Sequence, residues 1–175
     1  KAMGEAITER DSLPVMTTLG VTTLISDSGV TRYRVNTEEW MMYDRKKPSY
    51  WAFEKGVYME QFDSIFNVEA SIKADTAYYY DKERLWKLIG NVDIQNRKGE
   101  RFNTELLYWN EATQKVYSDK FIRIQQPDRI ITGHGFDSNQ QMTIYTIRNI
   151  EGIFYVDEEA SSGPPNIVSC QNTTV

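Results

Sequence analysis

The residues of this sequence that could do chemistry are few and far apart. His134 is the one histidine and Cys170 the one cysteine, which excludes a disulfide within the chain, a multi-cysteine metal site and a cluster of histidine ligands. A lone histidine also argues against a Ser-His-Asp or Cys-His catalytic arrangement. Residues 133–135 read Gly-His-Gly and are not followed by Gly-Lys-Ser or Gly-Lys-Thr, so they are typical of a strand bend rather than of a phosphate loop.

Some carboxylates could pair for acid–base catalysis, for example those of Asp75 and Asp93. They fall on the expected outward faces of strands, where charged side chains are ordinary solvent-exposed residues. We therefore expect no catalytic residue, no metal site and no cofactor. The balance of 25 Asp and Glu against 20 Lys and Arg also argues against a nucleic-acid partner, because phosphate contacts require a concentrated positive face.

Aromatic side chains gather in two short stretches of the sequence. They are Tyr78, Tyr79, Tyr80, Tyr108 and Trp109. Two interpretations fit them: they pack a core, or they line a sheet curved into a trough that holds acyl chains or another apolar ligand. The trough is favoured by small residues in neighbouring stretches, namely Ala70, Ala74, Ala77 and Gly90.

The elements that position these residues are predicted to be strands. Val, Ile and Thr number 41 against 15 Leu and Ala, a balance that favours sheet over helix. Residues 66–75 alternate strictly between apolar and polar side chains, as a strand with one buried face does. About a dozen such short strands, separated by turn residues, predict an all-β sandwich or open barrel. No run of apolar residues is long enough to span a bilayer.

The same pattern sets the expected boundaries. Residues 1–19 are expected to be a linker, and because the sequence begins at Lys1 rather than Met, we expect an anchor or export segment to precede it. Residues 20–156 form the expected β-domain, and residues 157–175 a flexible tail. Self-comparison at offsets of 30 and 35 residues superimposes aromatic strands, which is typical of stacked β-units with free edges at both ends.

Five short motifs occur in an order that is similar to one known family. They are Tyr33-Arg34-Val35 followed by Tyr43; Gly56-Val57 followed by Phe62-Asp63; Ser71-Ile72-Lys73-Ala74-Asp75 followed by Ala77; Leu85 followed by Gly90-Asn91-Val92-Asp93-Ile94; and the run from Asp128 to Gly133. Over residues 20–156 the chain resembles the LptC family, the periplasmic, inner-membrane-anchored component of lipopolysaccharide export.

The resemblance implies a twisted, open, boat-shaped β-jelly-roll that is not an enzyme and carries lipid A acyl chains along an apolar groove. It implies that lipopolysaccharide arrives from an inner-membrane ABC transporter and passes to a periplasmic bridge protein of similar fold. LptF/LptG-like periplasmic domains would meet the N-terminal edge and an LptA-like bridge protein the C-terminal edge. The chain would be held at the inner membrane by a transmembrane helix or a lipid anchor.

Strand parity then nominates individual residues. The inward parity of the expected strands predicts these groove-lining residues: Val35, Val57, Met59, Val68, Ala70, Ile72, Leu88, Val92, Ile94, Ile122, Ile124 and Ile144. The expected partner edges contain Val21, Thr23 and Ile25 at the N-terminal end, and Met142, Tyr145, Ile147, Ile153 and Tyr155 at the C-terminal end. Unpaired edges accept a partner's strand by β-augmentation, which also leaves an edge-to-edge homodimer open.

Two other functions remain open from the sequence. The first is a structural scaffold that joins β-domains edge to edge without holding lipid. The second is a glycan-binding β-protein, in which exposed aromatic side chains such as Tyr108 and Trp109 would stack on sugars.

Overall fold

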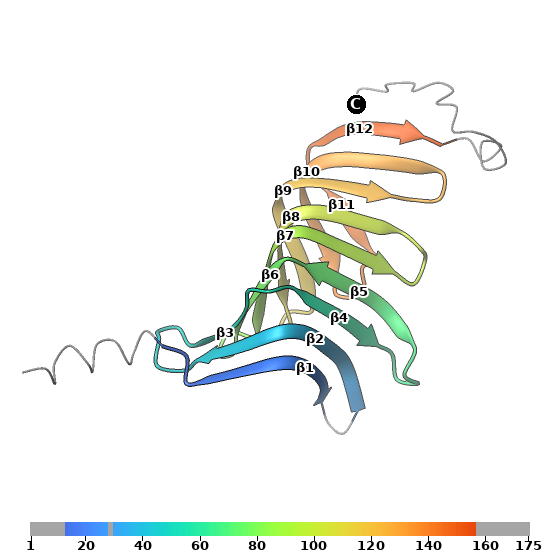
Figure 1. The fold of residues 1–175 in the computed structure, drawn as a ribbon. Coiled ribbons are helices and arrows are strands. Elements are labelled where there is room, and N and C mark those ends of the chain that lie inside the picture. The colour runs from blue at the N-terminus through green and yellow to red at the C-terminus, as the bar shows by residue number, and fades with distance from the viewer. Residues whose placement is uncertain (1–12, 28–29, 157–175) are drawn as a thin grey trace, which may run out of the picture.

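The computed structural model describes residues 13–27 and 30–156, and they build a single antiparallel sheet of twelve strands (Figure 1). The strands are β1 (Met16–Asp27), β2 (Val30–Tyr43), β3 (Tyr50–Phe53), β4 (Val57–Phe62), β5 (Val68–Ala74), β6 (Thr76–Tyr80), β7 (Leu85–Asn96), β8 (Arg101–Asn110), β9 (Lys115–Gln125), β10 (Arg129–Asn139), β11 (Tyr145–Ile147) and β12 (Ile150–Tyr155). The all-β prediction is confirmed. Within the described residues, no helix is long and apolar enough to cross a membrane.

One boundary differs from the sequence-based expectation. Strand β1 begins at Met16, ahead of the expected start of the β-domain at residue 20. A turn at Gly56, whose φ of 97° is one that glycine adopts without strain, separates β3 from β4. Residues 115–125 form one bent strand, β9. The expected leader over residues 1–12 and tail over 157–175, with Cys170, lie outside the described residues.

The sheet folds into two faces because its long strands bend. The first face consists of β4, β5 and β12 with residues 21–27, 30–37, 92–96, 101–104, 122–125 and 129–133 of the long strands. The second face consists of β3, β6 and β11 with residues 40–43, 85–89, 106–110, 115–118 and 136–139. In Figure 1 the first face forms the stack from β1 to β12, and β3, β6 and β11 lie behind it. This is a folded β-jelly-roll.

A line of bulges marks the bend. The register shifts between Ile89 and Val92 on β7, and again between His134 and Phe136 on β10. Gly90 lies in the first of these bulges with a φ of 82°, and a Cβ there would come within 3.0 Å of the Asp75 carboxylate. Bulges of this kind bend a strand and increase its twist, which turns one sheet into two facing layers.

Buried hydroxyl groups replace backbone hydrogen bonds that the bend interrupts. Thr37 Oγ1 donates to the carbonyl oxygen of Gly56 at 2.8 Å, and Thr104 Oγ1 donates to that of Phe121 at 2.8 Å. Ser118 Oγ donates to the carbonyl oxygen of Leu106 at 2.6 Å. All three donors are buried, so these bonds satisfy backbone carbonyls that water does not reach.

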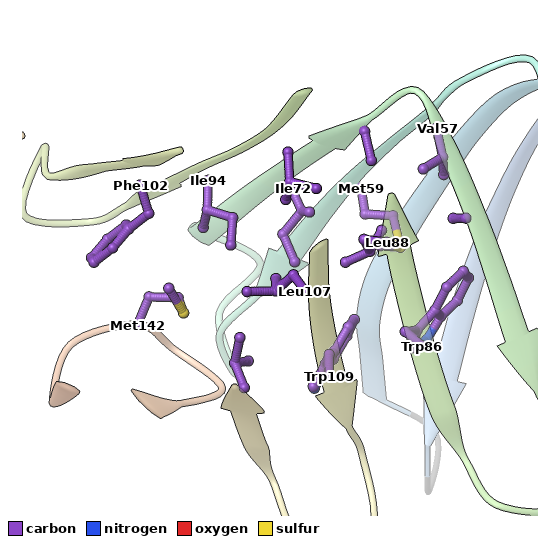
Figure 2. Close-up of a cluster of buried hydrophobic side chains, with 14 of the residues drawn as sticks. Val57, Met59, Ile72, Trp86, Leu88, Ile94, Phe102, Leu107, Trp109 and Met142 are labelled. Atoms are coloured by element: carbon purple, nitrogen blue, oxygen red, sulfur yellow. The ribbon is translucent and has the colours of Figure 1, made fainter. Parts of the chain in front are cut away.

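The core lies between the two faces. Figure 2 shows Met59, Ile72 and Ile94 of the first face pointing toward Leu88 and Leu107 of the second. Leu88, Ile94 and Leu107 have no exposed surface. The apolar side chains of both faces therefore form one continuous interior that follows the stack of strands.

Candidate functional site

The interior contains most of the residues that strand parity nominated as groove lining. The buried ones are Val35, Val57, Met59, Ala70, Ile72, Leu88, Val92, Ile94, Ile122 and Ile124. They come from β2, β4, β5, β7 and β9, so the bend brings together side chains that are far apart in the sequence. Their burial places these ten side chains in one apolar interior, and their contact with an acyl chain stays a prediction.

Val68 and Ile144 do not line the interior. Val68 is 46% exposed because β5 has an extra residue opposite the step from Gln61 to Phe62, and this register shift carries Val68 away from the core. Ile144 is 76% exposed because it lies in the turn between β10 and β11 rather than in a strand. Both predictions assumed an unbroken alternation that the bulge and the turn interrupt.

The predicted partner edges mostly lie at the two ends of the stack. Val21, Thr23 and Ile25 belong to β1, which among the described strands pairs only with β2. Tyr145 and Ile147 belong to β11, and Ile153 and Tyr155 to β12, both of which pair with β10. Met142 is the exception: it is fully buried, and Figure 2 shows it pointing into the interior near Ile94 and Phe102.

The aromatic residues divide between the inside and the outside of the fold. Tyr79 and Trp109 face the interior and are buried. Tyr78, Tyr80 and Tyr108 face outward and are half-exposed. The alternation of strands β6 and β8 explains this division, and it places Trp109 in the core rather than on a surface where it would stack on sugars from outside.

Tryptophan and tyrosine rings fill the β1 end of the interior. Tyr79 packs against Trp51 and Trp86 with ring centroids 4.9 and 4.7 Å apart, and Trp109 lies 6.3 Å from Trp86. Trp86 and Trp109 belong to the buried core, and the partly buried Trp40 and Trp51 pack against it. A cavity beside them measures about 10 Å³, which is no larger than one water probe. This end of the interior is therefore packed rather than hollow.

A polar contact joins the two faces at the β1 end of the interior. It lies on the side of the fold opposite the bend, which we call the mouth. The carboxylate of Glu111 accepts hydrogen bonds from the Tyr33 hydroxyl at 2.9 Å and from the Trp86 indole at 3.0 Å. Tyr33 comes from the first face, whereas Trp86 and Glu111 come from the second face and its β8–β9 turn. Burial, reinforced by the nearby carboxylate, raises the pKa of Tyr33. We call Tyr33, Trp86 and Glu111 the N-terminal clasp.

A second contact joins the faces toward the β12 end. Asn96 of the first face donates to the carbonyl oxygen of Met142 at 2.8 Å and to the Glu100 carboxylate at 2.9 Å. Glu100 in turn accepts a hydrogen bond from the Tyr145 hydroxyl. Burial and the bond to Glu100 raise the pKa of Tyr145 to about 12. We call Asn96, Glu100, Met142 and Tyr145 the C-terminal clasp.

This arrangement encloses a continuous apolar surface between the two faces. No group of three or more potential metal ligands occurs among residues 13–27 and 30–156. His134 pairs with Glu151 at 2.6 Å on the outer surface, away from the interior. Sequence reasoning missed the two clasps. The available signals were Glu100 and Glu111, acidic residues beside aromatic strands, but their partners are too distant in the sequence to be inferred from spacing.

The comparison with known proteins agrees with this architecture. The family model described as lipopolysaccharide-assembly, LptC-related, matches residues 15–151. The matched span runs from just before β1 into β12 and includes the bend, the interior and both clasps. No curated protein matches the sequence.

Proposed function

This chain belongs to the LptC-related family of lipopolysaccharide-assembly proteins, and we propose that it holds the acyl chains of lipopolysaccharide between its two sheet faces during transfer. The family is a periplasmic component of the lipopolysaccharide transport machinery, and membership gives the chain a role in that transport. The family is one of transport components and is not a known enzyme family. The route, the acyl-chain site and the partners below are our proposal.

The observation that carries the proposal is the continuous apolar interior between two free sheet edges. It extends from Val35 on β2 to Ile124 on β9 and Ile131 on β10. Each methylene group moved from water into such a surface gains about 0.8 kcal/mol, so a run of apolar surface suffices to hold an acyl chain without a cofactor. Stacked modules with exposed edges can join their interiors end to end.

We propose a direction for this transfer. Lipopolysaccharide enters from the periplasmic domains of an inner-membrane ABC transporter, LptF/LptG-like, docked at β1. It leaves to an LptA-like bridge protein docked at β11 and β12. The chain is held at the inner membrane by a transmembrane or lipid anchor. The edge position of these strands supports this assignment.

Acyl chains enter by separation of the two faces. Leu88, Val92 and Ile122 have no exposed surface, so an acyl chain reaches them by displacing side-chain contacts. The bend supplies the hinge line and the two clasps close the opposite mouth. In this proposal the protein without lipid has the closely packed interior described above. When lipid is bound, contacts between side chains of the two faces are replaced by contacts with its acyl chains.

Photo-crosslinking tests the proposal. A crosslinking amino acid replaces Leu88, Val92 or Ile122 in the interior, and Lys73 or Asp93 on the outward parity serves as the matched control. Purified lipopolysaccharide should form adducts at the interior positions and not at the controls. Equal labelling at all positions, or labelling at none in folded variants, would contradict the proposal.

The packed interior also favours one alternative, a scaffold that joins β-domains edge to edge without holding lipid. Val92→Asp distinguishes the two functions, provided that circular dichroism shows a folded variant. Lipid transfer predicts loss of lipopolysaccharide binding while edge-to-edge assembly persists. The scaffold predicts that assembly is the only function and that no lipid binding exists to be lost.

A further inference from the structure

A polar crevice opens at the mouth of the fold, directly above the N-terminal clasp. Its volume is about 530 Å³. One wall comes from the first face, with Arg32 on β2 and the β4–β5 turn at Asp63. The other wall comes from turns of the second face, with Arg84, Gln114 and Gln141. The crevice thus spans the same opening through which an acyl chain would enter the interior.

The floor and the walls of the crevice differ in chemistry. The floor is aromatic, because Tyr33, Tyr79 and Trp109 line it with their rings largely buried. The walls present amides, guanidinium groups and carboxylates, which combine hydrogen-bond donors with acceptors. An acyl chain cannot form hydrogen bonds with such walls. A ligand with many hydroxyl groups can both donate hydrogen bonds to them and accept hydrogen bonds from them.

Two of the residues that line the crevice have donors without an acceptor among the described residues. The indole N–H of Trp109 is buried and has no hydrogen-bond partner among the described residues. Arg32 is exposed and makes no ion pair within the described part of the chain. A buried donor without an acceptor destabilises the protein, whereas the exposed guanidinium of Arg32 can donate directly to a ligand oxygen in the crevice.

Three carboxylates line the crevice, on Asp63, Glu69 and Glu111, and each has a partner among the described residues; that of Glu69 lies 4.0 Å from the Arg97 guanidinium. Asp63 accepts the backbone N–H groups of Ile65 and Asn67 at 3.0 and 2.8 Å, and these bonds lower its pKa. Glu111 accepts the two hydrogen bonds of the N-terminal clasp. Arg32 remains as a donor on one wall, and the exposed Arg84 on the other wall has one guanidinium nitrogen 4.0 Å from the Glu111 carboxylate.

We infer that this crevice binds the saccharide portion of lipopolysaccharide while the acyl chains lie between the two faces. The inference rests on the proposed function for the identity of the glycan, but the mixed donors and acceptors over an aromatic floor point to a saccharide independently. The crevice lies at the mouth, above the interior. A saccharide bound there would therefore hold the lipid in place while its acyl chains lie between the two faces.

Calorimetry with deacylated lipopolysaccharide tests the inference, because this probe carries the saccharide without acyl chains. Arg32→Ala combined with Gln114→Ala should weaken binding of the probe at least about tenfold, since each change removes a hydrogen-bond donor. Arg123→Ala combined with Gln95→Ala, on the outer surface, is the matched control and should leave the affinity unchanged. A soluble cell-wall glycan fragment serves as a second probe and should bind more weakly.

The outcomes separate this inference from the proposed function. If the deacylated probe does not bind while lipopolysaccharide still crosslinks at Leu88 and Ile122, the crevice assignment is wrong and the acyl-chain site stands. If the probe binds but no interior adduct forms, the saccharide site stands and lipid transfer is wrong. Equal affinity of both variants, or equal or tighter binding of the cell-wall fragment, overturns the assignment of this crevice to lipopolysaccharide.

Discussion

Replacement of Glu111 by alanine is the most informative single perturbation of the protein without lipid. The Glu111 side chain is 11% exposed and accepts hydrogen bonds from both faces. Without it, the indole N–H of the fully buried Trp86 has no acceptor, which costs about 1–3 kcal/mol. The Tyr33 hydroxyl borders the crevice and can turn to water, so its loss adds little. Loss of the ion pair with Arg84, whose guanidinium lies 4.0 Å away and is largely exposed, should lower the free energy of unfolding by about 0–1 kcal/mol more.

Urea unfolding measures this effect. Glu111→Ala should lower the free energy of unfolding by about 1–4 kcal/mol with an unchanged m-value. Glu111→Gln keeps a neutral acceptor oxygen and should lose about half as much, because a hydrogen bond to a charged group is roughly twice as strong as a neutral one. Glu105→Ala is the control, because that exposed carboxylate accepts only an exposed N–H from Asn91. If Glu111→Ala is as stable as Glu105→Ala, the clasp does not hold the faces together.

Three further predictions concern the bend, the C-terminal clasp and pH. Thr104→Val should lower the free energy of unfolding in urea by about 1–3 kcal/mol, because it leaves the Phe121 carbonyl without its hydrogen-bond donor. The control Thr146→Val changes an exposed side chain and should lower it by less than about 0.5 kcal/mol. Met142→Ala should lower the free energy of unfolding by about 2–5 kcal/mol, because it leaves a cavity in the core. A change near zero would show that the Met142 side chain does not pack in the interior. Because the pKa of Tyr145 is raised from 10.0 to about 12, its neutral form stabilises the fold below pH 10, and this stability is lost as the pH rises from 10 to 12. Tyr145→Phe should make unfolding stability fall less over that interval, and an unchanged pH profile would contradict the assignment.

The strands and their inward faces could be predicted from the sequence because they depend on local alternation. Ala70, Ile72 and Ala74 alternate with polar residues over a single strand, and all three are buried as that alternation requires. The same reasoning failed for Val68 at a bulge and for Ile144 in a turn, since each interrupts the alternation by one or more residues. Inward parity is therefore a reliable guide inside a strand but not across its irregularities.

The clasps and the crevice could not be predicted because they are products of the bend. Tyr33 and Glu111 are separated by 78 positions in the sequence and meet only after the sheet folds over itself. Nor does anything in the local sequence distinguish Thr104, whose hydroxyl bonds to a carbonyl at the bend, from a threonine on the surface. Motif order identified the family, since the residues that carry the resemblance lie within the span that the family model matches.

The central claim is that acyl chains occupy the space between the two faces, and the buried Trp86 and Trp109 report on that space, with the partly buried Trp40 and Trp51 packed against it. The measurement is quenching of tryptophan fluorescence by lipopolysaccharide that carries a nitroxide on an acyl chain, with a water-soluble nitroxide as the control. Trp86 has no exposed surface and Trp109 is 4% exposed, so in a variant that also carries Trp40→Phe and Trp51→Phe the soluble nitroxide should quench weakly. The account predicts strong, saturable quenching by the acyl-chain nitroxide. Binding of labelled lipopolysaccharide with no more quenching than the soluble nitroxide gives would place the acyl chains outside the fold and contradict the account.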